Sequence, residues 1–108
     1  MSTRLPGSKY KRVFDRGRAL RAHLLTAYVL KAEDAGRQAG VVVSKKSFHD
    51  AVDRNRAKRI LREGFRLVAP ELAPDADWVL VGRATLAGKR TADVMDELRY
   101  VARKCGLC

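Results

Sequence analysis

Acidic residues are scarce in this chain. It carries 12 Asp and Glu against 23 Lys and Arg, so its formal net charge is +11. A balance this basic says little about the fold, but it indicates a polyanionic partner. For a basic cytoplasmic protein of this size, nucleic acid is the expected partner. An anionic membrane surface would instead require a helix with accessible, bulky apolar residues.

Long apolar runs are also absent. No stretch approaches the ~20 apolar residues that a membrane-spanning helix requires. Residues 1–7 lack the apolar core of a signal peptide, so the cytoplasm is the expected location. The chain is 46% apolar, which predicts a folded protein rather than a disordered one. Its 108 residues predict a single domain over 1–108, with tails at 1–7 and 105–108.

Motifs for catalysis by the protein itself are missing. There is no Gly-rich phosphate loop, no nucleophile elbow and no cluster of Ser, His and Asp. His23 and His49 are isolated, and Cys105 and Cys108 form one C-x-x-C after a predicted helix end. A redox pair favours a helix N-terminus, and a zinc site needs a second pair of ligands. Two reduced thiols and no metal site are therefore expected.

Two carboxylates, Asp50 and Asp53, are close enough in sequence to lie side by side on one helical turn. A nuclease site carried by the protein would need such a pair to hold metal ions. The many arginines that follow favour another interpretation, in which both acids cap the helix and interact with its dipole. A protein-only nuclease is therefore the weakest of the functional hypotheses.

The stretch from 51 to 66 predicts an amphipathic helix with an almost wholly cationic polar face. At ~100° per residue, its apolar residues share one continuous arc that faces inward. One acid, Glu63, lies among the cations, so their charge is not neutralised as in an ordinary solvated helix. The inward arc contains Ala57, Ile60, Leu61, Gly64, Phe65, Leu67 and Val68. The cations are Arg54, Arg56, Lys58, Arg59, Arg62 and Arg66, with Asn55 among them.

Further elements are predicted on both sides of this helix. Residues 8–17 predict a first helix with Ser8 as its N-cap and Gly17 after its end. The β-branched and apolar runs 24–32, 40–46 and 78–81 predict strands. A last helix is predicted after Thr91, its N-cap, because apolar residues recur there at helical spacing.

This order of elements predicts a single-domain α+β two-layer sandwich, helix–strands–helix–strand–helix (αβββαβα-like). If the strands ending at Lys46 and starting near Trp78 are parallel, the basic helix is the crossover between them. It would then cover one face of the sheet and direct its Arg and Lys side chains outward.

Several of these segments together resemble a known family. Residues 43–46 (Val-Ser-Lys-Lys), followed by 51–65 with Arg-Asn-Arg near their start, are similar to the signature of the bacterial ribonuclease P protein subunit. Residues 10–17 resemble that family's aromatic-x-x-Val-Phe-x-x-Gly first helix. Residues 28–30 resemble its second strand, and residues 78–83 resemble a strand that leads into a basic residue. The resemblance covers nearly the whole chain.

The resemblance implies a function, which is to assist a catalytic RNA in removing the 5′ leader of precursor tRNA. The protein would be one component of an endoribonuclease whose catalytic centre and Mg²⁺ ions belong to the RNA. No cofactor bound tightly by the protein, no membrane and no obligate protein partner are implied. The resemblance also implies a left-handed crossover at the basic helix, against the usual rule.

Site residues follow from the resemblance together with residue chemistry. Cations neutralise phosphates and make RNA affinity depend steeply on salt, while Asn55 offers both a donor and an acceptor. Aromatic rings stack on unpaired bases with little sequence preference, although Tyr10 and Phe14 also fit a core-facing helix. The residues expected to bind the catalytic RNA are Arg54, Asn55, Arg56, Lys58, Arg59, Arg62, Arg66, Lys45 and Lys46. Those expected in a leader-binding cleft are Tyr10, Phe14, Tyr28, Lys9, Arg12, Arg16 and Arg83. Lys89 and Arg90, in a predicted loop, are weaker candidates for contact with the RNA backbone.

One departure from the family pattern lies between Lys46 and Ala51. Here the chain has Ser-Phe-His-Asp, whereas the commoner version is one residue shorter and carries a Gly. The turn into the basic helix is expected to differ, and no contact is transferred to Phe48 or His49.

The alternative function is a non-catalytic RNA-binding protein, such as a ribosomal protein or an RNA chaperone. It would bury the aromatic residues and bind without regard to a leader.

Overall fold

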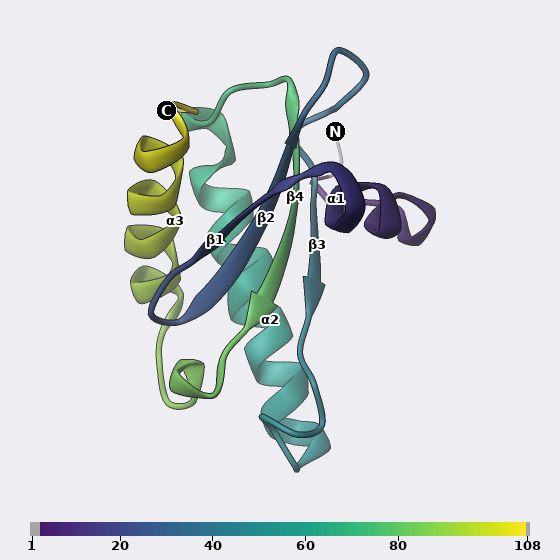
Figure 1. Ribbon diagram of the computed structural model, residues 1–108. Coiled ribbons are helices and arrows are strands. Elements are labelled where there is room, and N and C mark those ends of the chain that lie inside the picture. The colour runs from purple at the N-terminus through teal and green to yellow at the C-terminus, as the bar shows by residue number, and fades with distance from the viewer. Residues whose placement is uncertain (1–2, 108) are drawn as a thin grey trace.

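The computed structural model describes residues 3–107 of the chain. In this part of the chain, three α-helices and four strands are joined by short loops and single 3₁₀ turns (Figure 1). The helices are α1 (Tyr10–Arg16), α2 (Ala51–Val68) and α3 (Thr91–Cys105), and the strands are β1 (Arg18–Arg21), β2 (Leu25–Lys31), β3 (Ala39–Val42) and β4 (Ala76–Gly82). None of the described helices is both long and apolar enough to cross a membrane.

The four strands form one mixed sheet in the order β1-β2-β4-β3. β4 pairs antiparallel with β2, Val79 lying opposite Tyr28, and parallel with β3, Val79 lying opposite Gly40. α2 therefore connects two adjacent parallel strands, as the sequence predicted. In Figure 1, β3 and β4 run downward with α2 behind them and β4 to the left of β3, which makes this crossover left-handed.

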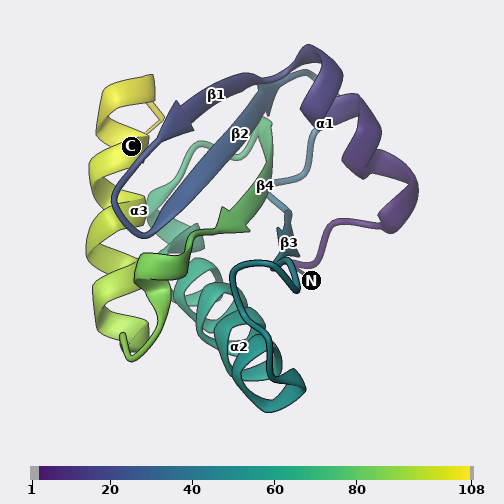
Figure 2. The ribbon, with the colours of Figure 1, turned by 60° about the horizontal axis from the view of Figure 1, so that its bottom comes forward.

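The helices are divided between the two faces of the sheet. α2 and α3 cover one face, and α1 packs on the other, against β2 and β4 (Figure 2). Alternation along β4 explains the division, because Trp78 and Leu80 join the cluster with α2 and α3 whereas Val79 joins the cluster with α1. Strand alternation thus gives the sheet two separate apolar layers.

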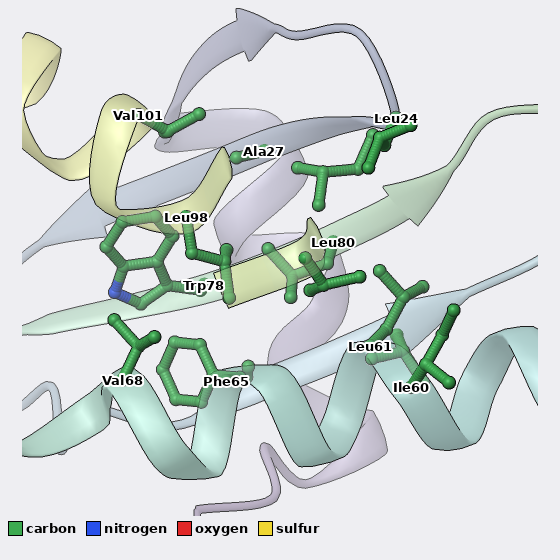
Figure 3. Packing of buried hydrophobic residues seen from close by; sticks show 14 of the residues in the cluster. Leu24, Ala27, Ile60, Leu61, Phe65, Val68, Trp78, Leu80, Leu98 and Val101 are labelled. Carbon is green, nitrogen blue, oxygen red and sulfur yellow. The ribbon is translucent and has the colours of Figure 1, made fainter. Parts of the chain in front are cut away.

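The larger core lies between the sheet and the α2–α3 pair. Trp78 is fully buried, and its ring meets the ring of Phe65 edge to face, with centroids 5.9 Å apart (Figure 3). α2 and α3 approach closely at Gly64, where a Cβ atom would come within 2.6 Å of Val94 Cγ1. A glycine in the middle of a helix is unfavourable by itself, so here close helix packing explains its presence.

Several local predictions need correction. Leu67 was expected inside but is 42% exposed, because it lies beyond the edge of the face that the sheet and α3 cover. The second predicted strand ends at Val42 rather than Lys46, because the chain turns at residues 44–47, where the Phe48 amide donates to the Ser44 carbonyl. Neither Ser8 nor Thr91 is an N-cap, since Lys9 and Arg90 occupy those positions.

Neither predicted tail is free in the described residues. Leu5 is buried, its amide donates to the Ala39 carbonyl (3.0 Å), and the Ala39 amide donates to the Thr3 carbonyl (2.8 Å). At the other end, Cys105 completes α3, and buried Leu107 accepts a bond from the Ala73 amide (2.7 Å). Both segments are therefore attached to the fold by backbone hydrogen bonds, which sequence periodicity cannot show.

Candidate RNA-binding site

The polar face of α2 points away from the sheet because the apolar face is buried. Ala57, Ile60, Leu61, Phe65 and Val68 are all at most 5% exposed. On the opposite side, the predicted RNA-binding residues Asn55, Arg59 and Arg66 are exposed, and Lys58 and Arg62 are half-buried. We call these residues (Asn55, Lys58, Arg59, Arg62 and Arg66) the cationic face of α2. The structure therefore brings four of the six cations predicted on this helix onto one solvent-facing surface.

One of these cations is paired. The Arg66 guanidinium donates to both carboxylate oxygens of Glu63, and this bond holds the pKa of Glu63 below its ordinary value. The pair is exposed, so it contributes little to stability. Its effect on the site is to reduce the free positive charge at Arg66, which leaves the N-terminal part of the cationic face as its most electropositive part.

The two arginines at the edges of this face also bond to the backbone of neighbouring loops. Arg54 Nη1 donates to the carbonyls of Phe48 (2.9 Å) and His49 (2.8 Å), in the segment just before α2. Arg56 Nη2 donates to the Lys89 carbonyl (2.7 Å), in the loop before α3. Each guanidinium carries five N–H donors. Both side chains therefore support the loops around the N-terminus of α2 while keeping donors for a ligand.

The other predicted RNA contacts lie beside the start of α2. Lys45 and Lys46 are exposed in the turn that follows β3. Ser44 shapes this turn, since its Oγ accepts a bond from the Ser47 amide (3.2 Å). The first turns of α2 extend past the ends of β3 and β4 (Figure 1). This end of the molecule therefore gathers cations from a turn, a helix and a loop.

A second surface lies on the opposite face of the sheet, beside α1. Phe14 is 37% exposed and meets Tyr28 edge to face, with ring centroids 4.8 Å apart. Val42 and Val81, on neighbouring strands of the same face, are only partly buried. We call this surface (Phe14, Tyr28, Val42 and Val81) the aromatic sheet face. It is a surface on which an unpaired base can stack.

Tyr10 has a different role from the other two aromatic residues. Its hydroxyl oxygen accepts a hydrogen bond from the Val41 amide (3.2 Å), and its ring lies over Gly40. Val41 belongs to the edge strand β3, whose outer amides need partners. Tyr10 thus attaches α1 to β3, and of the three aromatic residues it is the one fixed by a hydrogen bond.

This arrangement predicts the effect of Gly40→Ala. The new Cβ atom would lie 2.3 Å from Tyr10 Cζ, so the ring must move and the hydroxyl must leave the Val41 amide. We expect faster hydrogen exchange at Val41 and a destabilisation of about 0.5–1.5 kcal/mol, measured by NMR exchange and urea unfolding. Tyr10→Phe is the control, because it removes the same bond without moving the ring. Unchanged exchange in Gly40→Ala would contradict the close packing.

Two of the cations predicted for the leader cleft, Arg12 and Arg83, are bonded to neighbouring loops. Arg12 makes a two-pronged pair with Asp34 in the β2–β3 loop (2.8 and 2.7 Å), which holds the pKa of Asp34 below its ordinary value. Arg83 Nη1 donates to the Ala22 carbonyl (2.6 Å), supporting the β1–β2 turn. Arg16 is exposed at the end of α1, and Lys9 precedes that helix, half-buried.

The sequence did not indicate Val42 and Val81, which complete the aromatic sheet face, or Asp77, which holds the β2–β3 loop. Val42 and Val81 could have been found from strand alternation, since each is two residues from a residue of the same face. Asp77 gave no comparable signal. It is buried, and its carboxylate accepts bonds from the amides of Gly36 (3.0 Å) and Gln38 (3.4 Å), which positions the β2–β3 loop.

The C-x-x-C segment lies only partly in the described chain. Cys105 is half-buried at the end of α3, and burial raises the pKa of its thiol. This makes it a poor nucleophile at neutral pH. Cys108 lies outside the described residues. Among residues 3–107, no group of three or more His, Cys, Asp or Glu side chains is placed to hold a metal ion.

Comparison with known proteins identifies the family. Residues 5–106 match the protein family described as Ribonuclease P. The chain belongs to the ribonuclease P protein family. The ribonuclease P protein components of Exiguobacterium sp. and Clostridium acetobutylicum are each 34% identical to it. These matches cover 89% and 93% of this chain and 82% and 85% of the two relatives.

Solved structures of ribonuclease P proteins share the fold. The protein from Thermotoga maritima superposes with a TM-score of 0.79 at 24% identity, covering 94% of this chain and 96% of that one. The protein from Staphylococcus aureus gives 0.79 at 21% identity, covering 99% and 98%. The predicted α+β fold is therefore confirmed. As a ribonuclease P protein component, the chain is the protein part of an endoribonuclease holoenzyme.

Proposed function

We propose that this chain binds the catalytic RNA of ribonuclease P through the cationic face of α2 and the turn after β3. The observation that carries the proposal is the single-sided charge of α2, whose apolar face is fully occupied by the core. Contacts between these cations and phosphates release counterions, which gives affinity without base readout. The RNA that makes this contact is the folded, catalytic subunit of the holoenzyme.

The aromatic sheet face is proposed to hold the 5′ leader of precursor tRNA. Phe14 and Tyr28 present ring edges and faces to which unpaired bases can stack, for about 1–3 kcal/mol per base. Stacking makes little distinction between bases, which suits a protein that must accept many leader sequences. Because this surface and α2 lie on opposite faces of the sheet, leader and catalytic RNA would contact different sides of one small domain.

In this proposal the RNA performs the chemistry. It holds the Mg²⁺ ions and positions the attacking water, and the protein lowers the Mg²⁺ concentration that cleavage requires by neutralising phosphates and retaining the leader. The place of action is the cytoplasm, where precursor tRNA is made. The family match favours this function over a ribosomal protein or an RNA chaperone.

The test is cleavage of a 5′-extended precursor tRNA by the catalytic RNA at low Mg²⁺, with no protein, with the wild type, and with Arg54→Ala/Arg56→Ala. We expect strong stimulation by the wild type and its loss in the variant. Because Arg54 and Arg56 also bond to loop carbonyls, the variant's melting temperature must be measured alongside. Tight binding to any structured RNA without stimulation would support the chaperone alternative. Cleavage by the protein alone would contradict both.

A further inference from the structure

A small pocket lies between the N-terminal turns of α2 and the loop that precedes α3. Its volume is about 210 Å³, below the ~300–1,000 Å³ typical of sites for whole drug-sized ligands. Its apolar lining comes from Phe48, Ala57 and Leu86, all at most 5% exposed. The space therefore suits one flat ring system rather than a whole nucleotide.

Two charged side chains also line this pocket, Asp53 and Arg56. They lie one helical turn apart, yet in the described part of the chain no ion pair joins Asp53 to Arg56 or to another cation. Arg56 is held in place by its bond to the Lys89 carbonyl. The pocket thus combines a carboxylate, which only accepts hydrogen bonds, with a guanidinium, which only donates them.

The Asp53 carboxylate restricts which chemical groups can bind in the pocket. A phosphate would be repelled by Asp53 and would lose hydration against the apolar lining. A nucleobase fits both features, because its faces are apolar and its edge carries donors and acceptors. Lys89 follows Gly88 of the lining in the loop, and its side chain can bind a phosphate that flanks such a base.

We propose that this pocket binds a guanine base turned out of the catalytic RNA. Guanine presents two adjacent donors, N1–H and N2–H, which one carboxylate accepts together, and its O6 and N7 are the acceptors that arginine most often recognises. The other bases offer a carboxylate a single donor group. Unpaired bases read on their edges are the usual means of sequence recognition in RNA. The proposal rests on the proposed function, because it takes the catalytic RNA as the partner of α2.

The test uses Asp53→Asn with Asp50→Asn as its matched control. Both residues are exposed at the start of α2 and each change removes one negative charge, but only Asp53 lines the pocket. General electrostatics predicts that either change leaves binding of the polyanion unchanged or tightens it. The guanine pocket predicts that Asp53→Asn weakens binding of the catalytic RNA by about fivefold or more.

Chemical footprinting with kethoxal, which modifies the N1 and N2 positions of guanine, locates the base at saturating protein. We expect a guanine that is protected by the wild type and by Asp50→Asn, and that becomes reactive in the Asp53→Asn complex. Identical footprints for all three proteins would overturn the pocket while leaving the proposed function intact. If the wild type does not prefer the catalytic RNA to other structured RNAs, the proposed function fails.

A second measurement tests the pocket without the catalytic RNA. Addition of 5′-GMP to the wild-type protein is expected to shift the NMR amide signals of Ala57 and Gly88 more than 5′-AMP does. Asp53→Asn is expected to abolish this difference and Asp50→Asn to keep it. Equal shifts from the two nucleotides in the wild type would overturn the proposal.

Discussion

Replacing Arg59 and Arg62 together by alanine is expected to weaken binding of the catalytic RNA by about 10- to 100-fold. Both side chains lie on the cationic face of α2, and neither forms a hydrogen bond or ion pair within the described residues. If each contacts one phosphate, the slope of log K against log salt falls by about 1.4–1.8. Affinity measured across a series of salt concentrations checks both values.

The matched control for this variant is Arg103→Ala/Lys104→Ala, at the far end of α3. It removes the same charge from exposed positions of another helix, so it separates a localised contact from the effect of net charge. The control is expected to leave the slope nearly unchanged. Equal losses in the two variants would show that RNA binding follows overall charge rather than the surface of α2.

Trp78→Ala is expected to cost about 3–5 kcal/mol of unfolding free energy, a large share of the ~5–15 kcal/mol of a typical small domain. Trp78 is fully buried in the central strand β4, facing α2 and α3 and contacting the ring of Phe65. Its loss would remove an aromatic contact and leave a cavity where three elements meet. Urea denaturation, followed by far-ultraviolet circular dichroism, measures the cost.

An exposed aromatic residue gives the comparison. Tyr100 lies on α3 and is 51% exposed, with the Lys104 ammonium 5.6 Å from its ring centroid. Tyr100→Ala is expected to cost less than about 1 kcal/mol. Similar costs at the two positions would contradict the placement of the core. Because Trp78 packs against α2, its replacement should also lower RNA affinity when a fraction of the protein unfolds.

Helical periodicity predicted α2 well because one face is apolar and the other polar, and the inward residues Ile60, Leu61 and Phe65 are all buried. It could not predict where the buried face ends, since that depends on the partner elements, and Leu67 lies just outside them. β1 gave no strand signal. It is a four-residue edge strand with an arginine at each end, and polar edge strands resemble loops in sequence.

The positions of the cations were predictable, but their bonds were not. Arg12, Arg56 and Arg83 donate to partners 22, 33 and 61 residues away in sequence. Such pairings depend on the folded arrangement of α1, α2 and the loop after β4. The sequence therefore predicts on which helix face the basic residues lie. The structure shows which of these residues also support loops.

The position of β4 has a consequence for how the protein matures during synthesis. β4 lies between β2 and β3 in the sheet, yet it is the last strand to leave the ribosome. Until residues 76–82 emerge, the β1–β2 hairpin and β3 have no shared neighbour, and α2 lacks the strand that carries Trp78. We expect the first three-quarters of the nascent chain to remain without a stable tertiary structure, and the fold to close cooperatively near the end of translation.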